Sequence, residues 1–171
     1  MKRKLLLLYF WFVRILLFTL PDVPIIMRLR GRLYGLGMKK CGKDFQVTHD
    51  VIIRGLENLS VGNHVYIGNM TVLLGSGKIY IDDNVQIGPH CTLASGKHKY
   101  VNGSFSRYES EIGKIVIEKG SWIAANCVLA YGAVLPQGSV LAACSYLSKP
   151  LKNPNSIYGG VPAEFIMKYS L

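Results

Sequence analysis

The sequence predicts a parallel β-helix, a fold in which the chain winds into stacked coils of short strands. Three features of residues 61–147 indicate it. An aliphatic residue returns about every six positions, a small or β-branched residue follows four positions later, and glycine, asparagine or aspartate often lies between them. A helix has a period of about 3.6 and a half-buried strand a period of about two, so neither explains six. The aliphatic series is Val61, Ile67, Leu73, Ile81, Ile87, Leu93, Ile117, Ile123, Leu129, Leu135, Leu141 and Leu147.

The physical basis of the repeat is a narrow interior shared by all coils. Aliphatic side chains fill it, and only a small residue fits beside them at each corner, where glycine, asparagine and aspartate supply turn conformations. Each coil covers the apolar residues of its neighbour, because a single coil has no core of its own. Cys91 and Cys127 take small inward positions, and no CxxC spacing occurs, so we predict buried thiols rather than disulfides or metal ligands.

Residues 1–43 differ from the rest of the chain in charge. The chain of 171 residues has a formal net charge of +10, and ten of its twenty lysines and arginines lie in this segment, with Asp22 as the one acid. Residues 44–171 are close to neutral and show no interleaving of basic and aromatic residues, so nucleic acid is not an expected partner. The positive charge is therefore a local property of the N-terminal segment.

Two apolar helices are predicted in this segment. The run from Leu5 to Leu20 is interrupted only by Arg14 and one threonine, and no small-residue cleavage site follows, which argues against a signal peptide. A spanning helix needs about 20 apolar residues and would bury Arg14. After two prolines, a second helix covers residues 25–36. We predict a helical hairpin on an anionic membrane surface, and the alternative is a cap on the open end of the β-helix.

The β-helix is expected over residues 44–149, followed by an extended tail over residues 150–171. Residues 44–60 form the first coil. The largest break is the stretch 97–113, which is ejected from the repeat and carries charged, polar and aromatic residues. Loops held on a rigid scaffold often carry function, so this ejected loop is the expected functional element. In the tail, Ala163–Tyr169 is predicted to form a short C-terminal helix.

One histidine is a candidate catalytic base. His98 opens the ejected loop, whereas His49, His64 and His90 lie at or near outward corners of the repeat. A zinc site of the kind found in β-helix carbonic anhydrases needs three convergent histidines, and His64 and His90 fall on different faces, so no metal site is expected. The sequence also lacks GxxxxGK[ST], GxGxxG and GxSxG motifs, which leaves nucleotide-loop and serine-hydrolase functions without support.

The repeat, the excursion that begins at His98 and the tail sequence GVPA over residues 160–163 together resemble the hexapeptide-repeat acyltransferases. Within that family the chain is similar to sugar O-acetyltransferases of the galactoside, maltose and polysaccharide type, over residues 44–168. The resemblance implies an all-β fold with a left-handed β-helix, a homotrimer, active sites between neighbouring subunits, and acetyl-CoA as co-substrate without a metal. His98 matches the general base, which takes the proton of a sugar hydroxyl as its oxygen attacks the thioester.

Further residues match positions that bind the two substrates in this family. Asn69 matches, with one gap, an asparagine that orients the acceptor, and Trp122 matches a tryptophan on the acceptor side. Where the family usually carries two basic residues after GVPA for the 3′-phosphate of coenzyme A, this chain departs with Glu164 and Met167. The positions implied to contact coenzyme A are Ala125, Ala143, Ser148, Lys149 and Lys168.

The N-terminal hairpin is also a departure from the soluble members of the family, and it favours a membrane-attached acceptor. We expect O-acetylation of a lipid-linked surface polysaccharide precursor, by a cytoplasmic enzyme peripheral on the inner face of the cytoplasmic membrane. The alternatives are N-acetylation of a nucleotide-linked amino sugar, O-acetylation of serine, a non-catalytic β-helix scaffold, or a zinc-dependent carbonic anhydrase-like protein. Glu109 and Glu111 are the carboxylates available as partners of His98.

Overall fold

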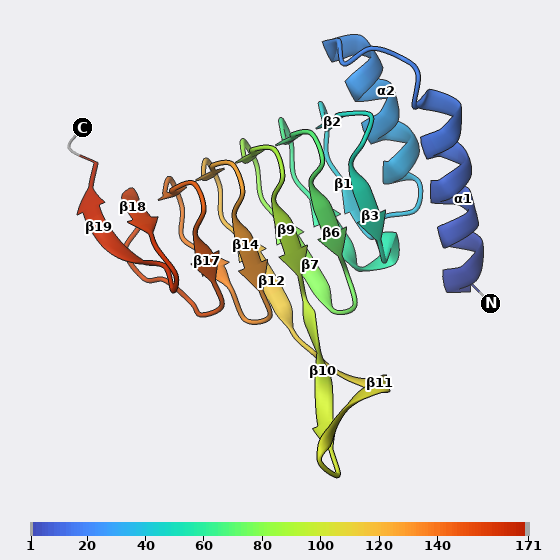
Figure 1. The fold of residues 1–171 in the computed structure, drawn as a ribbon. Coiled ribbons are helices and arrows are strands. Elements are labelled where there is room, and N and C mark those ends of the chain that lie inside the picture. The colour runs from blue at the N-terminus through green and yellow to red at the C-terminus, as the bar shows by residue number, and fades with distance from the viewer. Residues whose placement is uncertain (1, 170–171) are drawn as a thin grey trace.

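The computed structural model describes residues 2–169 and places two helices at one end of a parallel β-helix (Figure 1). Helix α1 covers Lys2–Leu17 and helix α2 covers Pro24–Gly35. The strands that follow are short, and three successive strands complete one coil. Within the described residues, five complete coils stack along the axis and β18 opens a sixth. The predicted parallel β-helix is confirmed.

Three sheets form the three faces of the β-helix, and we name them A, B and C. Sheet A contains β1 (Lys40–Cys41), β4 (Leu59–Val61), β7 (Lys78–Ile81), β12 (Lys114–Ile117) and β15 (Val134–Leu135). Sheet B contains β2 (Gln46–Val47), β5 (Tyr66–Ile67), β8 (Gln86–Ile87), β13 (Trp122–Ile123), β16 (Val140–Leu141), β18 (Ser156–Gly159) and β19 (Glu164–Lys168). Sheet C contains β3 (Ile52–Arg54), β6 (Val72–Leu74), β9 (Thr92–Ala94), β14 (Val128–Ala130) and β17 (Tyr146–Leu147). The turns between the faces are the A–B, B–C and C–A corners.

The interior is built from the residues of the six-residue repeat. Every aliphatic residue of the predicted series is buried, and so are the small residues expected beside them. Cys91 and Cys127 are both buried free thiols, as predicted. The small inward positions are Val65, Thr71, Val85, Cys91, Ser121, Cys127, Ala133, Ser139 and Ser145.

Extra residues in the early coils are confined to the C–A corner. Ile79 of β7 pairs with Ile115 of β12, and the ejected stretch lies between them in the sequence. In a later coil without an insertion, Val116 pairs with Val134, only 18 residues further along the chain. The first coil accommodates its extra residues in a short 3-10 helix, η1 (Leu56–Asn58), and the second in residues 75–77. Because the insertions all lie outside the strands, the inward register of the three sheets is preserved.

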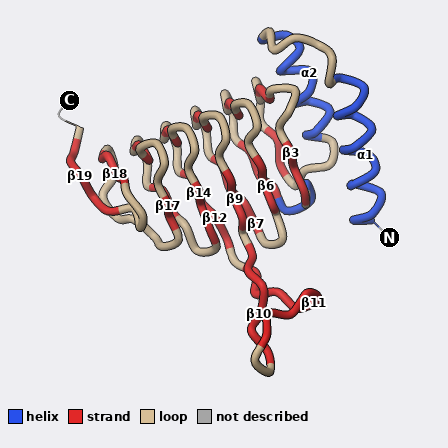
Figure 2. Tube along the Cα trace, viewed as in Figure 1, coloured by secondary structure: helices blue, strands red, loops and turns tan. Residues whose placement is uncertain are grey.

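The ejected stretch forms a β-hairpin and not an irregular loop. Strand β10 covers Gly96–Val101 and β11 covers Ser104–Ile112, and the two pair antiparallel. Figure 2 shows the hairpin projecting from the body of the β-helix. Asn102 and Gly103 connect its strands with φ of 49° and 83°. These left-handed conformations are those that an Asn-Gly hairpin turn requires, and the dipeptide was the available sequence signal.

The N-terminal helices cap the open end of the β-helix. Helix α2 lies against β2 of the first coil, and α1 lies on α2, where the rings of Phe10 and Tyr34 are 4.8 Å apart. Gly31 lets α2 approach closely, because a Cβ there would collide with the backbone carbonyl of Phe45. The first coil begins at Lys40, so it includes residues 40–43, which the charge pattern of the sequence places in the N-terminal segment. The cap proposed as the alternative is therefore present.

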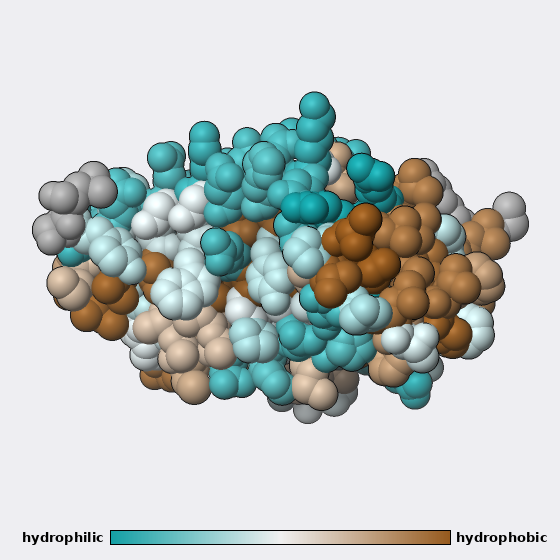
Figure 3. Space-filling model, turned by 90° about the horizontal axis from the view of Figure 1, so that it is seen from above, coloured by the Kyte–Doolittle hydropathy of each residue, from teal (hydrophilic) through white to brown (hydrophobic). Residues whose placement is uncertain are grey.

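The outer face of the cap is strongly apolar. Figure 3 shows hydrophobic residues gathered over the helical end of the molecule. Neither helix of the described chain has the length and apolar character needed to cross a membrane. Contact with a membrane surface stays a prediction. The exposed large apolar residues of α1 are Leu5, Leu7, Leu8, Trp11, Phe12, Ile15 and Leu16.

The predicted C-terminal helix is wrong. Residues Glu164–Lys168 form strand β19, which pairs antiparallel with β18, and Ala163 is buried. The edge strand β18 would otherwise present an unpaired row of backbone groups, and the returning chain satisfies them. This edge pairing outweighs the local preference for a helix.

Candidate functional site

The hairpin carries His98 on its first strand, outside the body of the β-helix. His98 pairs in register with Ser110, its ring is exposed, and its Nδ1 atom lies 2.9 Å from the carbonyl oxygen of Ser106. A carbonyl oxygen only accepts, so Nδ1 carries the proton and donates this bond. In the neutral imidazole the lone pair then lies on Nε2, which is left free as a proton acceptor. The Ser106 hydroxyl accepts bonds from the N–H groups of Tyr108 and Glu109, which fixes the segment that presents the carbonyl.

The two carboxylates considered as partners of His98 bind lysines instead. Glu109 lies 3.0 Å from Nζ of Lys99, and Glu111 lies 3.0 Å from Nζ of Lys97. Both pairs join β10 to β11 across the hairpin. The orienting group of His98 is therefore a neutral backbone carbonyl and not a carboxylate.

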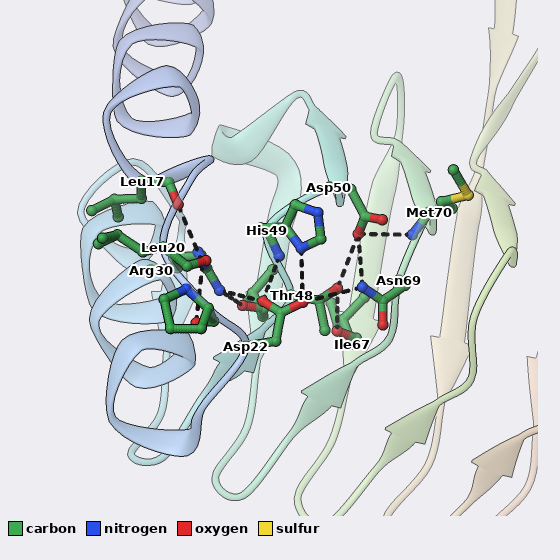
Figure 4. A network of polar contacts seen from close by, with 12 residues as sticks. Leu17, Leu20, Asp22, Arg30, Thr48, His49, Asp50, Ile67, Asn69 and Met70 are labelled. Atoms are coloured by element: carbon green, nitrogen blue, oxygen red, sulfur yellow. Dashed lines mark hydrogen bonds and ion pairs between the residues drawn. The ribbon is translucent and has the colours of Figure 1, made fainter.

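A second polar cluster lies at the B–C corner beside the helices (Figure 4). Asp22, in the connection between α1 and α2, accepts hydrogen bonds from Nη1 of Arg30 at 2.6 Å, Nδ1 of His49 at 2.7 Å and Nδ2 of Asn69 at 3.2 Å. Asp50 adds a second carboxylate, 3.3 Å from Nδ2 of Asn69. Two carboxylates, an imidazole and an amide thus converge from the helical cap and the first two coils.

Arg30 anchors this cluster from inside the protein. Its side chain is fully buried, and Nη2 donates to the carbonyl oxygens of Leu17, at 3.2 Å, and Leu20. Nη1 also lies 3.4 Å from the carbonyl oxygen of Val47. The last carbonyls of a helix lack partners within the helix, and a cation there is favourable. Arg30 therefore joins the end of α1 to α2 and the first coil, and Asp22 balances its charge.

Asp22 is held as a carboxylate. Partial burial by itself raises the pKa of Asp22, but the hydrogen bonds from His49 and Asn69 outweigh it and lower the pKa below its ordinary value. A carboxylate accepts hydrogen bonds and so can receive the hydroxyl protons of a ligand. Sequence analysis missed Asp22, His49 and Asp50 as a group. The available signal was that Asp22 is the one acid among the first 43 residues.

The positions predicted to present backbone amides to coenzyme A lie on the same corner as Asn69. Asn69, Ala125 and Ala143 each come two residues after a strand of sheet B, and bonds such as Cys144 N–H to the Ala125 carbonyl at 3.0 Å stack this corner. Within residues 2–169 the N–H groups of Ala125 and Ala143 donate no hydrogen bond, so both are available to a ligand. Trp122, on β13, has half of its surface exposed (50%).

The remaining predicted residues lie at or near the C-terminal end. Ser148 and Lys149 follow β17 at the C–A corner, and Lys168 lies on β19 opposite Ser156. Nζ of Lys149 is 2.6 Å from a carboxylate oxygen of Glu164. Glu164, one of the two residues at which the chain departs from the family pattern, therefore binds Lys149, which the resemblance places at coenzyme A.

One chain divides the predicted site between two corners. His98, Ser148 and Lys149 belong to the C–A side, whereas Asn69, Ala125 and the cluster around Asp22 belong to the B–C corner, with sheet C between them (Figure 1). The chain alone does not bring His98 and Asn69 together. Among the described residues no group of three or more His, Cys, Asp or Glu side chains is arranged as a metal site.

Two solved structures that are similar in fold are acetyltransferases. A hexapeptide-repeat acetyltransferase of Vibrio cholerae in complex with acetyl-CoA superposes with a TM-score of 0.81 at 23% identity, over 96% of this chain and 87% of that one. A maltose O-acetyltransferase of Clostridium difficile superposes with a TM-score of 0.83 at 21% identity, over 99% of this chain and 87% of that one. These likenesses establish the shared fold.

Sequence comparison adds curated relatives. The colanic acid biosynthesis acetyltransferase WcaF of Escherichia coli is 27% identical over 156 residues, 91% of this chain and 83% of that protein. The chain is therefore similar in sequence to an acetyltransferase over most of its length. A galactoside O-acetyltransferase of Escherichia coli is 28% identical over 109 residues, 64% of this chain and 53% of that protein. No family model matches the chain. The predicted resemblance to the hexapeptide-repeat acyltransferases, and with it the acyltransferase class, is confirmed.

Proposed function

We propose that the protein transfers the acetyl group of acetyl-CoA to a sugar hydroxyl, with His98 as general base. The observation that carries the proposal is the hydrogen bond from Nδ1 of His98 to the Ser106 carbonyl, which leaves Nε2 as the acceptor. Acetyl-CoA as co-substrate agrees with the acetyl-CoA complex of the Vibrio cholerae structure. The O-acetyltransferase type agrees with the galactoside and maltose enzymes among the similar proteins.

The chemistry requires one proton acceptor and one positioned thioester. Nε2 of His98 takes the hydroxyl proton as the sugar oxygen attacks the thioester carbonyl, which forms a tetrahedral intermediate. Collapse of that intermediate breaks the carbon–sulfur bond, and the imidazolium returns the proton to the departing thiolate of coenzyme A. General base catalysis of this kind contributes about 10²–10⁴ in rate.

The cluster around Asp22 and Asn69 is proposed as the acceptor side of the site. Sugars present several hydroxyl groups, and the carboxylates of Asp22 and Asp50 accept from hydroxyls while the Asn69 amide can donate or accept. The exposed indole of Trp122 supplies an apolar surface beside the same corner. Coenzyme A would lie along the ladder of Ala125 and Ala143, with its phosphates toward Ser148, Lys149 and Lys168.

The active site is proposed to form between neighbouring subunits of a homotrimer. Support comes from the separation of His98 and Asn69 on two sides of one chain, which a neighbouring copy can bridge. The site would then take its base from the hairpin of one subunit and its acceptor cluster from the B–C corner of the next.

The acceptor is proposed to be a lipid-linked precursor of a surface polysaccharide, bound at the inner face of the cytoplasmic membrane. The name of the relative WcaF places that protein in colanic acid biosynthesis. Residues 1–43 support attachment to an anionic membrane, because α1 exposes a broad apolar face beside a basic α2. Phe18, next to this face, packs its ring 5.3 Å from that of His49, so an acceptor held at the membrane would be close to the cluster.

An acceptor panel tests this function. Purified full-length protein is given acetyl-CoA with lipid-linked sugars, free galactosides or a dTDP-linked amino sugar, and release of free coenzyme A and product mass are measured. Acetyl esters of the lipid-linked sugars are expected. An acetylated amino group instead would favour the nucleotide-sugar alternative. An N-acyltransferase of Bacillus cereus in complex with dTDP and coenzyme A is similar in fold to this chain (TM-score 0.67, 19% identity, 82% of this chain and 88% of that one). No product with any acceptor would refute the proposal.

A further inference from the structure

A cavity of about 540 Å³ lies between α2 and the A–B corner of the first coil. One wall is the side of α2 that carries Arg28 and Arg32, four residues apart, and the other is the segment 41–45. The cavity is at the helical end of the β-helix, whereas Lys149 is near the other end (Figure 1). It is therefore separate from the position proposed for the phosphates of coenzyme A.

The lining of this cavity has an excess of positive charge. Arg28, Arg32 and Lys43 contribute three cations, and Asp44 is the one carboxylate. Nε of Arg28 lies 2.6 Å from Asp44, and this contact, with a second from His64, lowers the pKa of Asp44 to about 2. Arg28 therefore already balances Asp44. Arg32 and Lys43 are exposed and, within the described residues, form no hydrogen bond or ion pair through their side chains.

Exposed apolar residues of α2 adjoin the cavity on the solvent side. Leu36 lines the cavity and is 77% exposed, and Ile25 and Leu29 are exposed on the same side of α2 as Arg32. Residues 25, 29, 32 and 36 lie along one helix face by the spacing of three, four and seven residues. A helix face that mixes large apolar side chains with arginine is typical of elements that lie in a membrane interface.

We propose that this cavity binds a phosphate group, and that the phosphate is the headgroup of an anionic phospholipid. The inference rests on the membrane attachment proposed above and gives it a specific site. Arginine and lysine form charge-assisted hydrogen bonds to phosphate oxygens, and the planar guanidinium of Arg32 can bind two of them. Ile25, Leu29 and Leu36 would enter the acyl boundary while the cations beneath them meet the headgroup.

Vesicle binding by the full-length chain tests this site. Co-sedimentation is measured with vesicles of phosphatidylcholine alone and of phosphatidylcholine with phosphatidylglycerol, for the wild type, for Arg32→Gln/Lys43→Gln, and for the control Lys114→Gln/Lys119→Gln, which removes the same charge from exposed positions of the β-helix. We expect the pocket variant to bind the anionic vesicles about 25-fold more weakly, at about fivefold for each cation near the surface. The control pair should have a much smaller effect, because screening confines such attraction to about 8–10 Å.

The possible outcomes separate the pocket from the membrane attachment. If the cavity variant and the control variant lose binding to anionic vesicles equally, the proposed phosphate site is wrong, because only the net charge would then matter. Wild-type binding to both kinds of vesicle alike would also overturn it and leave membrane attachment standing, whereas binding to neither would remove both. Thermal unfolding in inorganic phosphate against chloride at equal ionic strength separates the sources. If inorganic phosphate stabilises the wild type but not the Arg32→Gln/Lys43→Gln variant, and the two bind vesicles equally, the site binds soluble phosphate. That result would refute the lipid headgroup as its ligand.

Discussion

At the scale of single residues, one hydrogen bond decides how His98 can act. Its Nδ1 donates to the carbonyl of Ser106, so the ring is oriented by a dipole and not by a full negative charge. A carboxylate partner would stabilise the imidazolium more strongly. In this hairpin Glu109 and Glu111 are instead engaged by Lys99 and Lys97. The carbonyl fixes the tautomer while the lysine pairs hold the two strands in register.

The first prediction concerns His98 itself. The substitution His98→Gln keeps a polar side chain of similar size but removes the titratable base, so we expect kcat to fall about 10²–10⁴-fold with little change in the KM for acetyl-CoA. Steady-state release of coenzyme A measures both constants. His64→Gln is the matched control, because His64 is an exposed histidine at the A–B corner, and its activity should equal that of the wild type. A His98→Gln enzyme with near-normal kcat would contradict the assigned role.

The second prediction concerns Asp22 and pH. Its pKa is lowered from 3.8 on folding, so its contribution to stability is fully present above about pH 4 and is lost as pH falls through the folded pKa. Asp22→Asn should destabilise the protein by about 3 kcal/mol at neutral pH, because it leaves the buried Arg30 without a counter-charge. Tm measured from pH 7 down to pH 3 should show a gap between wild type and variant that narrows in acid. The exposed Asp82→Asn should show no such gap, and a constant gap for Asp22→Asn would contradict the argument.

At the scale of elements, β19 changes what the C-terminal tail can do. As an edge strand it holds Glu164 beside Lys149, whereas a helix beginning at Ala163 would direct these side chains differently. The ion pair is exposed on both sides, and such pairs contribute about 0–1 kcal/mol to stability. Its greater consequence is that the lysine proposed to meet phosphate is already occupied by a carboxylate.

The third prediction follows from this pair. Glu164→Gln frees Lys149 at little cost in stability, so the KM for acetyl-CoA should fall about two- to fivefold with kcat nearly unchanged. Initial-rate kinetics over a range of acetyl-CoA concentrations provide the measurement. Glu118→Gln removes the same charge at the A–B corner and should leave the KM unchanged. An increase in the KM of Glu164→Gln would mean that Glu164 supports coenzyme A binding and not that it competes.

At the scale of the whole molecule, the β-helix separates functional groups as much as it positions them. All extra residues of the early coils, including the hairpin, leave the fold at the C–A corner, while the acceptor cluster forms at the B–C corner next to the helical cap. Asp22 and Arg30 belong both to the helical cap and to the acceptor cluster. The attachment of the helices therefore also determines the shape of the acceptor side.

The fourth prediction tests whether the site is shared between chains. His98→Ala and Asn69→Ala proteins, each impaired alone, are unfolded together and refolded as a mixture. If one site takes His98 from one subunit and Asn69 from the next, random trimers should recover about one quarter of the wild-type sites. Activity of the mixture, with native mass spectrometry to count subunits, measures this recovery. A mixture no more active than the average of its parents would place the whole site within one chain.

The sequence by itself determined the β-helix and the inward positions of its coils. Inward positions recur at a fixed local period, so burial can be predicted without knowing any long-range contact, and each residue of the series from Val61 to Leu147 is buried. The position of the hairpin followed from the same logic, because the stretch 97–113 interrupts that period. The two helices were predicted from their apolar runs and from the prolines between them. The family motifs also pointed to His98 and Asn69, whose roles remain predictions.

Only the tertiary structure decided which groups meet. Asp22 reaches Asn69 across 47 residues of sequence, the Ser106 carbonyl orients His98, and β19 pairs with β18 where a helix was predicted. None of these contacts produces a periodic pattern in the sequence, because each depends on how a cap, a hairpin or an edge strand folds back onto the coils. A repeat fixes the burial of its own residues, whereas the partners of polar side chains are fixed by the path of the chain between repeats.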